Sequence, residues 1–185
     1  MATALRLFSS RGTAAVSMRD LGEAAGVTVP GLYYHFRSKA ELIQAVYRAR
    51  GLDRPLDIAE LDDDLTVGRV EQRIVEQARR EFARLIDDED FLRLMQREAV
   101  LGDRDALEVG QTLGVRWRER WRVVLSGATD LDPRADVIAA ADVITTFLWG
   151  LFVEYLNQRD RSVAERITGL AALVSPSLGR PDRGR

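Results

Sequence analysis

The chain has 185 residues, of which 46% are hydrophobic and 30% are charged, and its formal net charge is −2. This size and composition suit one large or two smaller folded domains and exclude a disordered or fibrous chain. There is no cysteine and only one histidine. Disulfides, thiolate metal sites and histidine-rich zinc sites are therefore excluded, and we expect neither a metal nor a cofactor.

The charge is distributed unevenly along the sequence. Residues 1–50 carry seven basic and three acidic side chains, a net charge of +4, so the remaining 135 residues carry −6. A basic segment on an acidic body is the charge pattern of a small DNA-binding domain attached to a domain with another role. The distribution therefore favours a nucleic-acid partner for the N-terminal part.

Two short helices are expected at the start of the chain. The first covers residues 3–11 and has apolar residues at helical spacing. The second follows Ser17, an N-cap candidate with Asp20 three residues later, as in a capping box. Gly26 can end this helix, because glycine readily adopts the left-handed conformation found after helix C-termini.

A third short helix is expected directly after that glycine. Thr28 can cap it, and Pro30 falls in its first turn, where a missing N–H costs nothing. Leu32 and Phe36 lie four residues apart and so share one face. Two short helices joined by a tight turn form a helix-turn-helix, whose second helix can enter the major groove of DNA.

The second helix of this motif carries side chains suited to a DNA surface. Hydroxyl and basic groups hold phosphates, while small side chains near the helix start can approach base edges or a thymine methyl group. In the alternative interpretation the tyrosines are core and His35 is a solvated surface residue. For His35 alone, a solvated surface position is as good an interpretation as a DNA contact. For the whole helix-turn-helix segment the alternative is weaker, because the caps, the turn and the apolar spacing all agree with the DNA-binding motif. The predicted DNA-binding residues are Ser17, Arg19, Thr28, Val29, Pro30, Gly31, Tyr33, Tyr34, His35 and Lys39.

These residues resemble the DNA-binding domain of the tetracycline-repressor (TetR) family. The resemblance covers roughly residues 2 to 48, and it is specific in order and spacing. It rests on residues 4–8, Gly12, residues 17–21, residues 24–27, residues 32–36 and residues 38–42. Membership would imply a dimeric, all-helical, ligand-responsive transcription regulator, usually a repressor.

Some positions depart from the family pattern. Val29 stands where many members have Lys or Arg, and Gly31 stands where Thr or Ala is common, so the preferred DNA sequence cannot be copied from relatives. Members usually carry several more residues, often basic, before the first helix. We therefore expect either that this arm has been lost or that the native start lies upstream of Met1.

The rest of the sequence predicts further helices and no strand. A helix opens at Ser38 and connects the DNA-binding part to the body, and residues 52–65 are expected to be an acidic loop at the domain boundary. Apolar periodicity predicts helices over residues 66–87, 90–101, 105–126, 133–159 and 162–176. The expected fold is all-α, with a three-helix helix-turn-helix domain over residues 1–48, a helical ligand-binding and dimerisation domain over 49–176 and a disordered tail over 177–185.

The helix expected to start at Asp132 and Pro133 is apolar around most of its circumference, so both of its sides must be buried. One side can fill the core of the monomer. The other side, together with the last helix, can form a two-fold interface of four helices, which favours the homodimer that the resemblance also implies. The predicted interface residues are Val137, Ala141, Ile144, Leu148, Leu151, Tyr155, Val163, Ile167, Leu170 and Val174.

Large aromatic side chains in the domain predicted over residues 49–176 indicate the kind of ligand that this domain binds. A cavity lined by them would suit a small, mostly apolar or aromatic molecule. Ordinary packing explains any single one of these residues better, and the pocket is expected because the family resemblance implies one. The predicted pocket residues are Phe82, Phe91, Met95, Trp117, Trp121, Phe147, Trp149 and Phe152.

Other functions are weighed against a regulator. No carboxylate pair stands at catalytic spacing, no Gly-rich phosphate loop is present and no nucleophile has a base beside it, so no catalytic residue is predicted. A helical-bundle enzyme or small-molecule binding module without regulatory DNA binding therefore ranks lower, as does an architectural DNA protein without a ligand. The strongest apolar run, residues 143–153, is shorter than the roughly 20 residues of a membrane helix, so we expect a cytoplasmic protein with no membrane partner.

Overall fold

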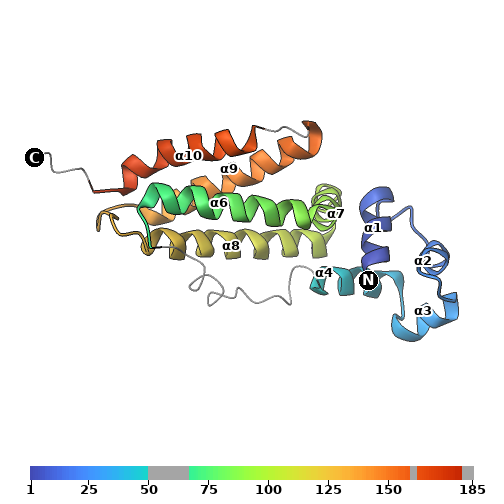
Figure 1. Cartoon of the computed structure of the whole chain (residues 1–185). Coiled ribbons are helices and arrows are strands. Elements are labelled where there is room, and N and C mark those ends of the chain that lie inside the picture. The colour runs from blue at the N-terminus through green and yellow to red at the C-terminus, as the bar shows by residue number, and fades with distance from the viewer. Residues whose placement is uncertain (50–66, 159–161, 181–185) are drawn as a thin grey trace, which may run out of the picture. The chain divides into compact units, whose positions relative to one another are not determined.

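The computed structural model describes residues 1–49, 67–158 and 162–180. Within these ranges every regular element is a helix, apart from an isolated β-bridge between Leu131 and Gly179 (Figure 1). The all-α fold class predicted from the sequence is therefore confirmed. The predicted acidic loop over residues 52–65 lies outside the described residues.

The described helices fall into two compact units. The first unit contains α1 (Ala2–Arg11), α2 (Met18–Ala25), α3 (Val29–His35), α4 (Lys39–Tyr47), α7 (Glu89–Val100) and the start of α8 (Arg104–Ser126). The second unit contains α6 (Val70–Asp87), the rest of α8, α9 (Val137–Gln158) and α10 (Val163–Leu178). The first unit is thus larger than the domain predicted over residues 1–48, because it also includes α7 and residues up to 113.

The helices of the DNA-binding motif begin and end at the predicted residues. Ser17 and Asp20 form a reciprocal capping box at the start of α2, in which the Asp20 carboxylate accepts the Ser17 backbone N–H at 2.7 Å. The hydrogen bonds from Ser17 lower the pKa of Asp20 to about 2. Gly26 ends α2 with φ of 67°, and Thr28 Oγ1 caps α3 by accepting the Gly31 N–H at 3.2 Å.

Polar contacts tie α1 to α7 in the first unit. Ser9 Oγ donates to Asp90 Oδ1 at 3.0 Å. The backbone N–H and the hydroxyl of Thr13 donate to the two oxygens of Glu98, at 3.1 and 2.7 Å. Because Glu98 is buried, its carboxylate fixes the turn that follows α1.

Apolar packing joins α4 to the same unit. Leu42, Val46 and Tyr47 are buried, and the ring of Tyr47 meets the ring of Phe91 edge to face, with centroids 6.4 Å apart. Since Phe91 belongs to α7, Tyr47 connects α4 to a helix beyond the helix-turn-helix.

The core of the second unit forms where α6 packs against α10 and α9. The ring of Phe82 on α6 contacts the rings of Phe152 and Tyr155 on α9, with centroids 6.4 and 5.7 Å apart. Among the described helices, α9 alone is long and apolar enough to cross a membrane by length and composition. Its residues Ile144 and Leu151 are buried against the other helices of this unit, as in the core helix of a globular domain.

The start of α9 differs from the prediction, since the helix begins at Val137 and not at Pro133. Asp132 forms a turn in which its carboxylate accepts the backbone N–H of Arg134 at 2.8 Å. The cap is instead Asp136, whose Oδ1 accepts a backbone N–H three residues later at 3.0 Å. The prediction was wrong because an Asp-Pro pair suits a turn as well as a helix start, and a second capping aspartate follows closely.

The C-terminal end of α10 is also longer than predicted. The helix continues through Pro176 to Leu178. Leu178 then accepts the Asp132 N–H at 2.8 Å, and Arg180 donates its N–H to the Asp130 carbonyl at 2.8 Å. Residues 177–180 of the predicted tail are therefore part of the second unit, while residues 181–185 lie outside the described residues.

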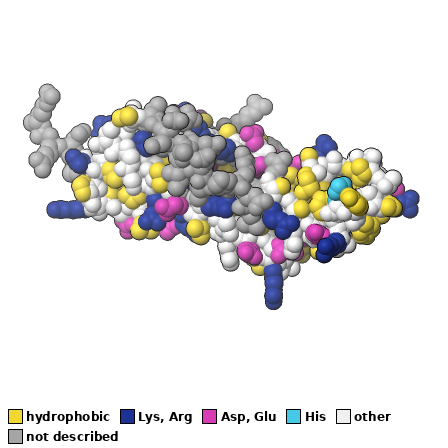
Figure 2. Space-filling view, turned by 90° about the horizontal axis from the view of Figure 1, so that it is seen from below, with side chains coloured by type: hydrophobic (Ala, Val, Ile, Leu, Met, Phe, Trp, Pro, Cys, Tyr) yellow, Lys and Arg dark blue, Asp and Glu magenta, His cyan; other side chains and the backbone are white. Residues whose placement is uncertain are grey.

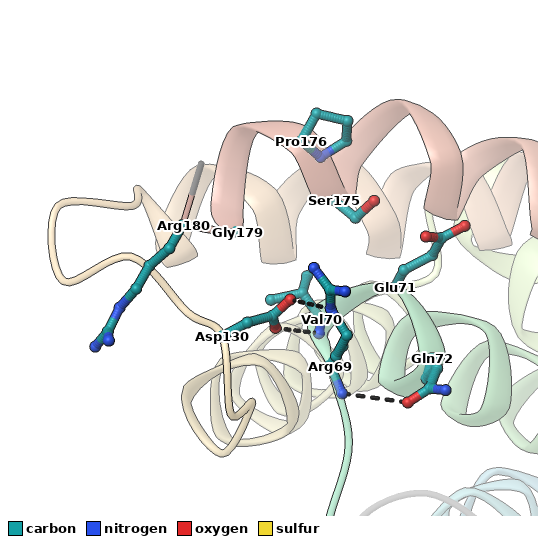
Figure 3. A pocket seen from close by; sticks show the side chains of 9 residues that line it. All are labelled: Arg69, Val70, Glu71, Gln72, Asp130, Ser175, Pro176, Gly179 and Arg180. Atoms are coloured by element: carbon teal, nitrogen blue, oxygen red, sulfur yellow. Dashed lines mark hydrogen bonds and ion pairs between the residues drawn. The ribbon is translucent and has the colours of Figure 1, made fainter. Parts of the chain in front are cut away.

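Asp130 connects the ends of several segments of the second unit (Figure 3). Its carboxylate accepts the Val70 backbone N–H and the Arg69 Nε–H, both at 2.8 Å, so it caps α6 from a distant part of the chain. Although burial acts to raise it, the hydrogen bonds from Arg69 and Val70 lower the pKa of Asp130. The open pocket beside it, of about 410 Å³, is lined by residues of this junction.

Replacing Asp130 with Ala should lower the free energy of unfolding by about 1–3 kcal/mol, because the first N–H of α6 loses its acceptor. Urea denaturation followed by circular dichroism measures this change. Glu71→Ala, in the exposed first turn of the same helix, is the matched control and should change stability much less. An Asp130→Ala protein as stable as its parent would contradict the capping role.

Candidate nucleic-acid interface

The exposed side of α3 combines aromatic and polar side chains. Tyr34 is 86% exposed and Tyr33 is 50% exposed. The ring of His35 lies beside that of Tyr34, with centroids 5.2 Å apart. Figure 2 shows hydrophobic side chains gathered around the single histidine at this surface. The alternative in which the tyrosines belong to the core is therefore wrong, and large exposed rings are typical of an interaction surface.

The position of α3 is set by its close approach to α2. A Cβ atom at Gly22 would lie 2.9 Å from the carbonyl oxygen of Val27, so only glycine fits there. Val27 donates its N–H to the Gly22 carbonyl at 3.0 Å. Val29 is half-buried beside Gly22, so it holds the junction of the two helices as well as standing at the start of α3.

The start of α3 keeps its small side chains accessible. Thr28 and Pro30 are exposed. A Cβ atom at Gly31 would lie 3.1 Å from Thr28 Oγ1, so glycine leaves the cap undisturbed. Thr28 therefore has a structural role in addition to the predicted DNA contact.

Lys39 is engaged within the chain. Its Nζ donates to the carbonyl oxygens of Thr13 and Val16, at 2.9 and 3.0 Å, and the side chain is partly buried. The first residue of α4 thus fastens the connection between α1 and α2. A phosphate contact by Lys39 remains a prediction, and the structural role has no local signal in the sequence because its partners lie more than twenty residues away.

The remaining predicted DNA contacts lie at the start of α2. Ser17 is exposed and takes part in the capping box. Arg19 is exposed and pairs with Glu23 one turn later, with Nε and Oε1 2.8 Å apart. An exposed pair of this kind is weak, so the guanidinium of Arg19 can exchange this partner for a phosphate.

Lys39→Met should lower the free energy of unfolding by about 1–3 kcal/mol, since two partly buried carbonyl groups lose their donor. Arg37→Met, two residues earlier and exposed, is the control and should leave stability nearly unchanged. Urea denaturation of both variants compares them. Equal stability of the two variants would show that the Lys39 hydrogen bonds contribute nothing.

Sequence reasoning gave no role to Glu98, although a signal was present. Phe91, Met95 and Glu98 lie at helical spacing on one face of α7, and all three are buried. A carboxylate on an apolar helix face must find donors when it is buried. Here the donors come from Thr13, which no local pattern identifies.

The structure divides the predicted pocket residues between the two units. Phe91 and Met95 are buried in the first unit. In the second unit Trp117 and Trp149 meet with ring centroids 5.8 Å apart, and Trp149 meets Phe152 at 5.6 Å. The residues of the second unit are Phe82, Trp117, Trp121, Phe147, Trp149 and Phe152. The ring of Phe147 lies instead under the guanidinium of Arg166, 5.9 Å from its centroid.

Most of the predicted interface residues are core residues of the second unit. Those buried within the chain are Ala141, Ile144, Leu148, Leu151, Ile167 and Leu170. Those partly exposed are Val137, Tyr155, Val163 and Val174. Buried side chains cannot meet a second protein without unfolding, so the six buried residues belong to the core of this unit, while an interface that includes the other four stays a prediction. Large apolar side chains exposed on α9 and α10 are Ile138, Val143 and Leu173.

Residues 1–46 match the family described as bacterial regulatory proteins, tetR family. The HTH-type transcriptional regulator TtgR of Pseudomonas putida is 49% identical over 41 residues, which are 22% of this chain and 20% of that protein. AcrR of Shigella flexneri, also an HTH-type transcriptional regulator, is 41% identical over 44 residues, 24% of this chain and 20% of that protein. These matches span about a fifth of the relatives' length.

A solved structure resembles the fold over nearly the whole chain. A transcriptional regulator from Saccharomonospora viridis in complex with choline has a TM-score of 0.73 at 16% identity, with 97% of this chain and 95% of that chain covered. At this identity the likeness shows the fold alone.

Proposed function

We propose that this chain, whose residues 1–46 match the tetR family of bacterial regulatory proteins, is a ligand-responsive transcriptional regulator that binds double-stranded DNA. The observation that carries this proposal is the exposed face of α3, with Tyr33, Tyr34 and Thr28 on a helix held rigidly by α2. We further propose that it acts in the cytoplasm as a repressor and that a small, mostly apolar molecule releases it from DNA. The aromatic residues in the core of the second unit support such a ligand.

DNA recognition divides between positioning and sequence selection. Tyr33, Tyr34 and Arg19 are placed to hold phosphates, which carry no sequence information. Thr28 and Gly31, at the start of α3, approach the base edges in the major groove. Two copies of the motif would read the halves of a palindromic operator, about 34 Å apart.

The proposed homodimer uses the exposed sides of α9 and α10. Leu173 is 81% exposed, Ile138 57% and Val143 52%, and exposed glycines on both helices, Gly150 and Gly169, permit close approach. A stable interface buries more than about 1,000 Å². The partly exposed residues of the seam predicted from sequence, Val137, Tyr155, Val163 and Val174, can contribute to the same interface.

Tyr34→Ala should weaken binding to DNA of any sequence by roughly tenfold, because a phosphate contact and a large exposed ring are lost. Fluorescence anisotropy with DNA from immediately upstream of the protein's own gene measures this loss, and Tyr34→Phe separates the hydroxyl from the ring. Leu101→Ala, another large exposed side chain of the first unit, is the control. Unchanged binding by Tyr34→Ala would remove α3 from the interface, and a parent without any DNA binding would favour the small-molecule binding module.

Leu173→Glu should convert the dimer to a monomer, because it places a charge in the middle of the apolar face. The control is Leu101→Glu, at an equally exposed leucine of the first unit. Sedimentation equilibrium reports the mass of each protein. A parent that sediments as a monomer, or a Leu173→Glu protein that remains dimeric, contradicts this interface.

A further inference from the structure

The core of the second unit contains polar side-chain atoms with no hydrogen-bond partner among the described residues. They are Gln77 Nε2, Glu81 Oε2, Trp121 Nε1 and Thr145 Oγ1. All four side chains are buried. Burying such atoms unpaired destabilises a protein, and native structures contain few of them. Several in one unit indicate a group that is satisfied by something other than this chain.

A hydrogen bond fixes the register between α6 and α8. Arg73 Nε donates to the carbonyl oxygen of Val124 at 2.8 Å. The two helices run in opposite directions (Figure 1). Gln77 lies one turn after Arg73 on α6, and Trp121 lies one turn before Val124 on α8. Because the two helices are antiparallel, Gln77 and Trp121 lie at the same height along the helix axes, which we call a level.

A ring contact fixes the register between α8 and α9, which also run in opposite directions. The rings of Trp117 and Trp149 are 5.8 Å apart. Trp121 lies one turn after Trp117 on α8, and Thr145 lies one turn before Trp149 on α9. Trp121 and Thr145 therefore lie at the same level as well. Unpaired polar atoms from three helices, those of Gln77, Trp121 and Thr145, therefore lie at one level of the core.

The polar atoms at this level are mainly hydrogen-bond donors. The Gln77 amide nitrogen and the Trp121 indole nitrogen can only donate, and the Thr145 hydroxyl can donate or accept. A molecule that satisfies them must therefore present acceptor atoms. One turn away, Trp117, Trp149 and Phe152 provide a cluster of aromatic faces for an apolar group.

Glu81 is a buried carboxyl group close to this level. It lies one turn beyond Gln77 on the same face of α6, close enough for Gln77 to influence its pKa, although no hydrogen bond of acceptable geometry joins them. Burial raises the pKa of Glu81 to about 7, against the lowering influence of Arg120, Gln77 and Arg84. Because the Glu81 side chain is buried one turn from Gln77, a ligand carboxylate at this level would put a second buried acid next to it, whereas a neutral oxygen would not.

We propose that the polar level formed by Gln77, Trp121 and Thr145 is a binding site for the neutral carbonyl oxygen of a planar aromatic molecule, whose rings pack against Trp117 and Trp149. This inference rests on the proposed ligand-responsive function and names the chemical class of the ligand. The carbonyl oxygen accepts hydrogen bonds from the unpaired N–H and O–H groups, which accounts for their retention in the core.

Matched probes test the chemistry of the site. Isothermal titration calorimetry compares 2-acetylnaphthalene, 2-isopropylnaphthalene, which lacks the oxygen, and 2-naphthoate, which carries a charge. The parent protein should bind the ketone at least about tenfold more tightly than either of the others. No binding of the ketone, equal affinity for ketone and hydrocarbon, or a preference for the carboxylate would each overturn the proposal.

Variants locate the preference at the polar level. Gln77→Leu and the isosteric Thr145→Val should each reduce the ketone preference several-fold without lowering the unfolding temperature, since each removes an unpaired polar group. Gln72→Leu, exposed on the same helix, should keep the full preference. If both core variants also keep it, the ketone is recognised elsewhere, and the proposal fails.

The test separates this inference from the proposed function. Titration without DNA reports only on the polar level, while anisotropy with the upstream DNA and no added compound reports only on DNA binding. Intact DNA binding without a ketone preference would overturn the inference alone. A ketone preference without any DNA binding would support the site and overturn the regulatory function.

Discussion

The surface proposed to bind DNA depends on how the chain holds Thr13, in the turn after α1. Its N–H and hydroxyl donate to the buried carboxylate of Glu98 on α7, and its carbonyl accepts a hydrogen bond from Lys39 on α4. Two oppositely charged side chains from distant helices therefore provide the hydrogen-bond partners of one residue, Thr13. Because α2 starts shortly after this turn and α3 packs on α2 at Gly22, the orientation of the exposed tyrosines follows from it.

This arrangement makes α7 part of the unit that contains the helix-turn-helix. The edge-to-face contact of Tyr47 with Phe91 adds an apolar connection to the polar one at Glu98. A movement of α7 would reach the helix-turn-helix through α1 as well as through α4. The second unit is built differently, since its aromatic core retains unpaired polar atoms that reduce stability but give a ligand something specific to bind.

Local chemistry in the sequence was sufficient for the helix-turn-helix. Ser17, Asp20, Gly26 and Thr28 each act within four residues of their own position, as caps or as a left-handed turn. Such interactions depend on spacing along the chain alone, so the sequence predicts them correctly. The same holds for the all-α fold class, because apolar periodicity is also a local property.

Only the tertiary structure decided which apolar face of α9 is core and what Lys39, Glu98 and Asp130 do. Each of these depends on a partner more than twenty residues away, and spacing along the chain does not identify such a partner. The sequence determined that α9 is apolar on two sides; packing against α6 decided which side is buried. Where two faces have similar hydrophobicity, the choice belongs to the helices that surround them and not to the helix itself.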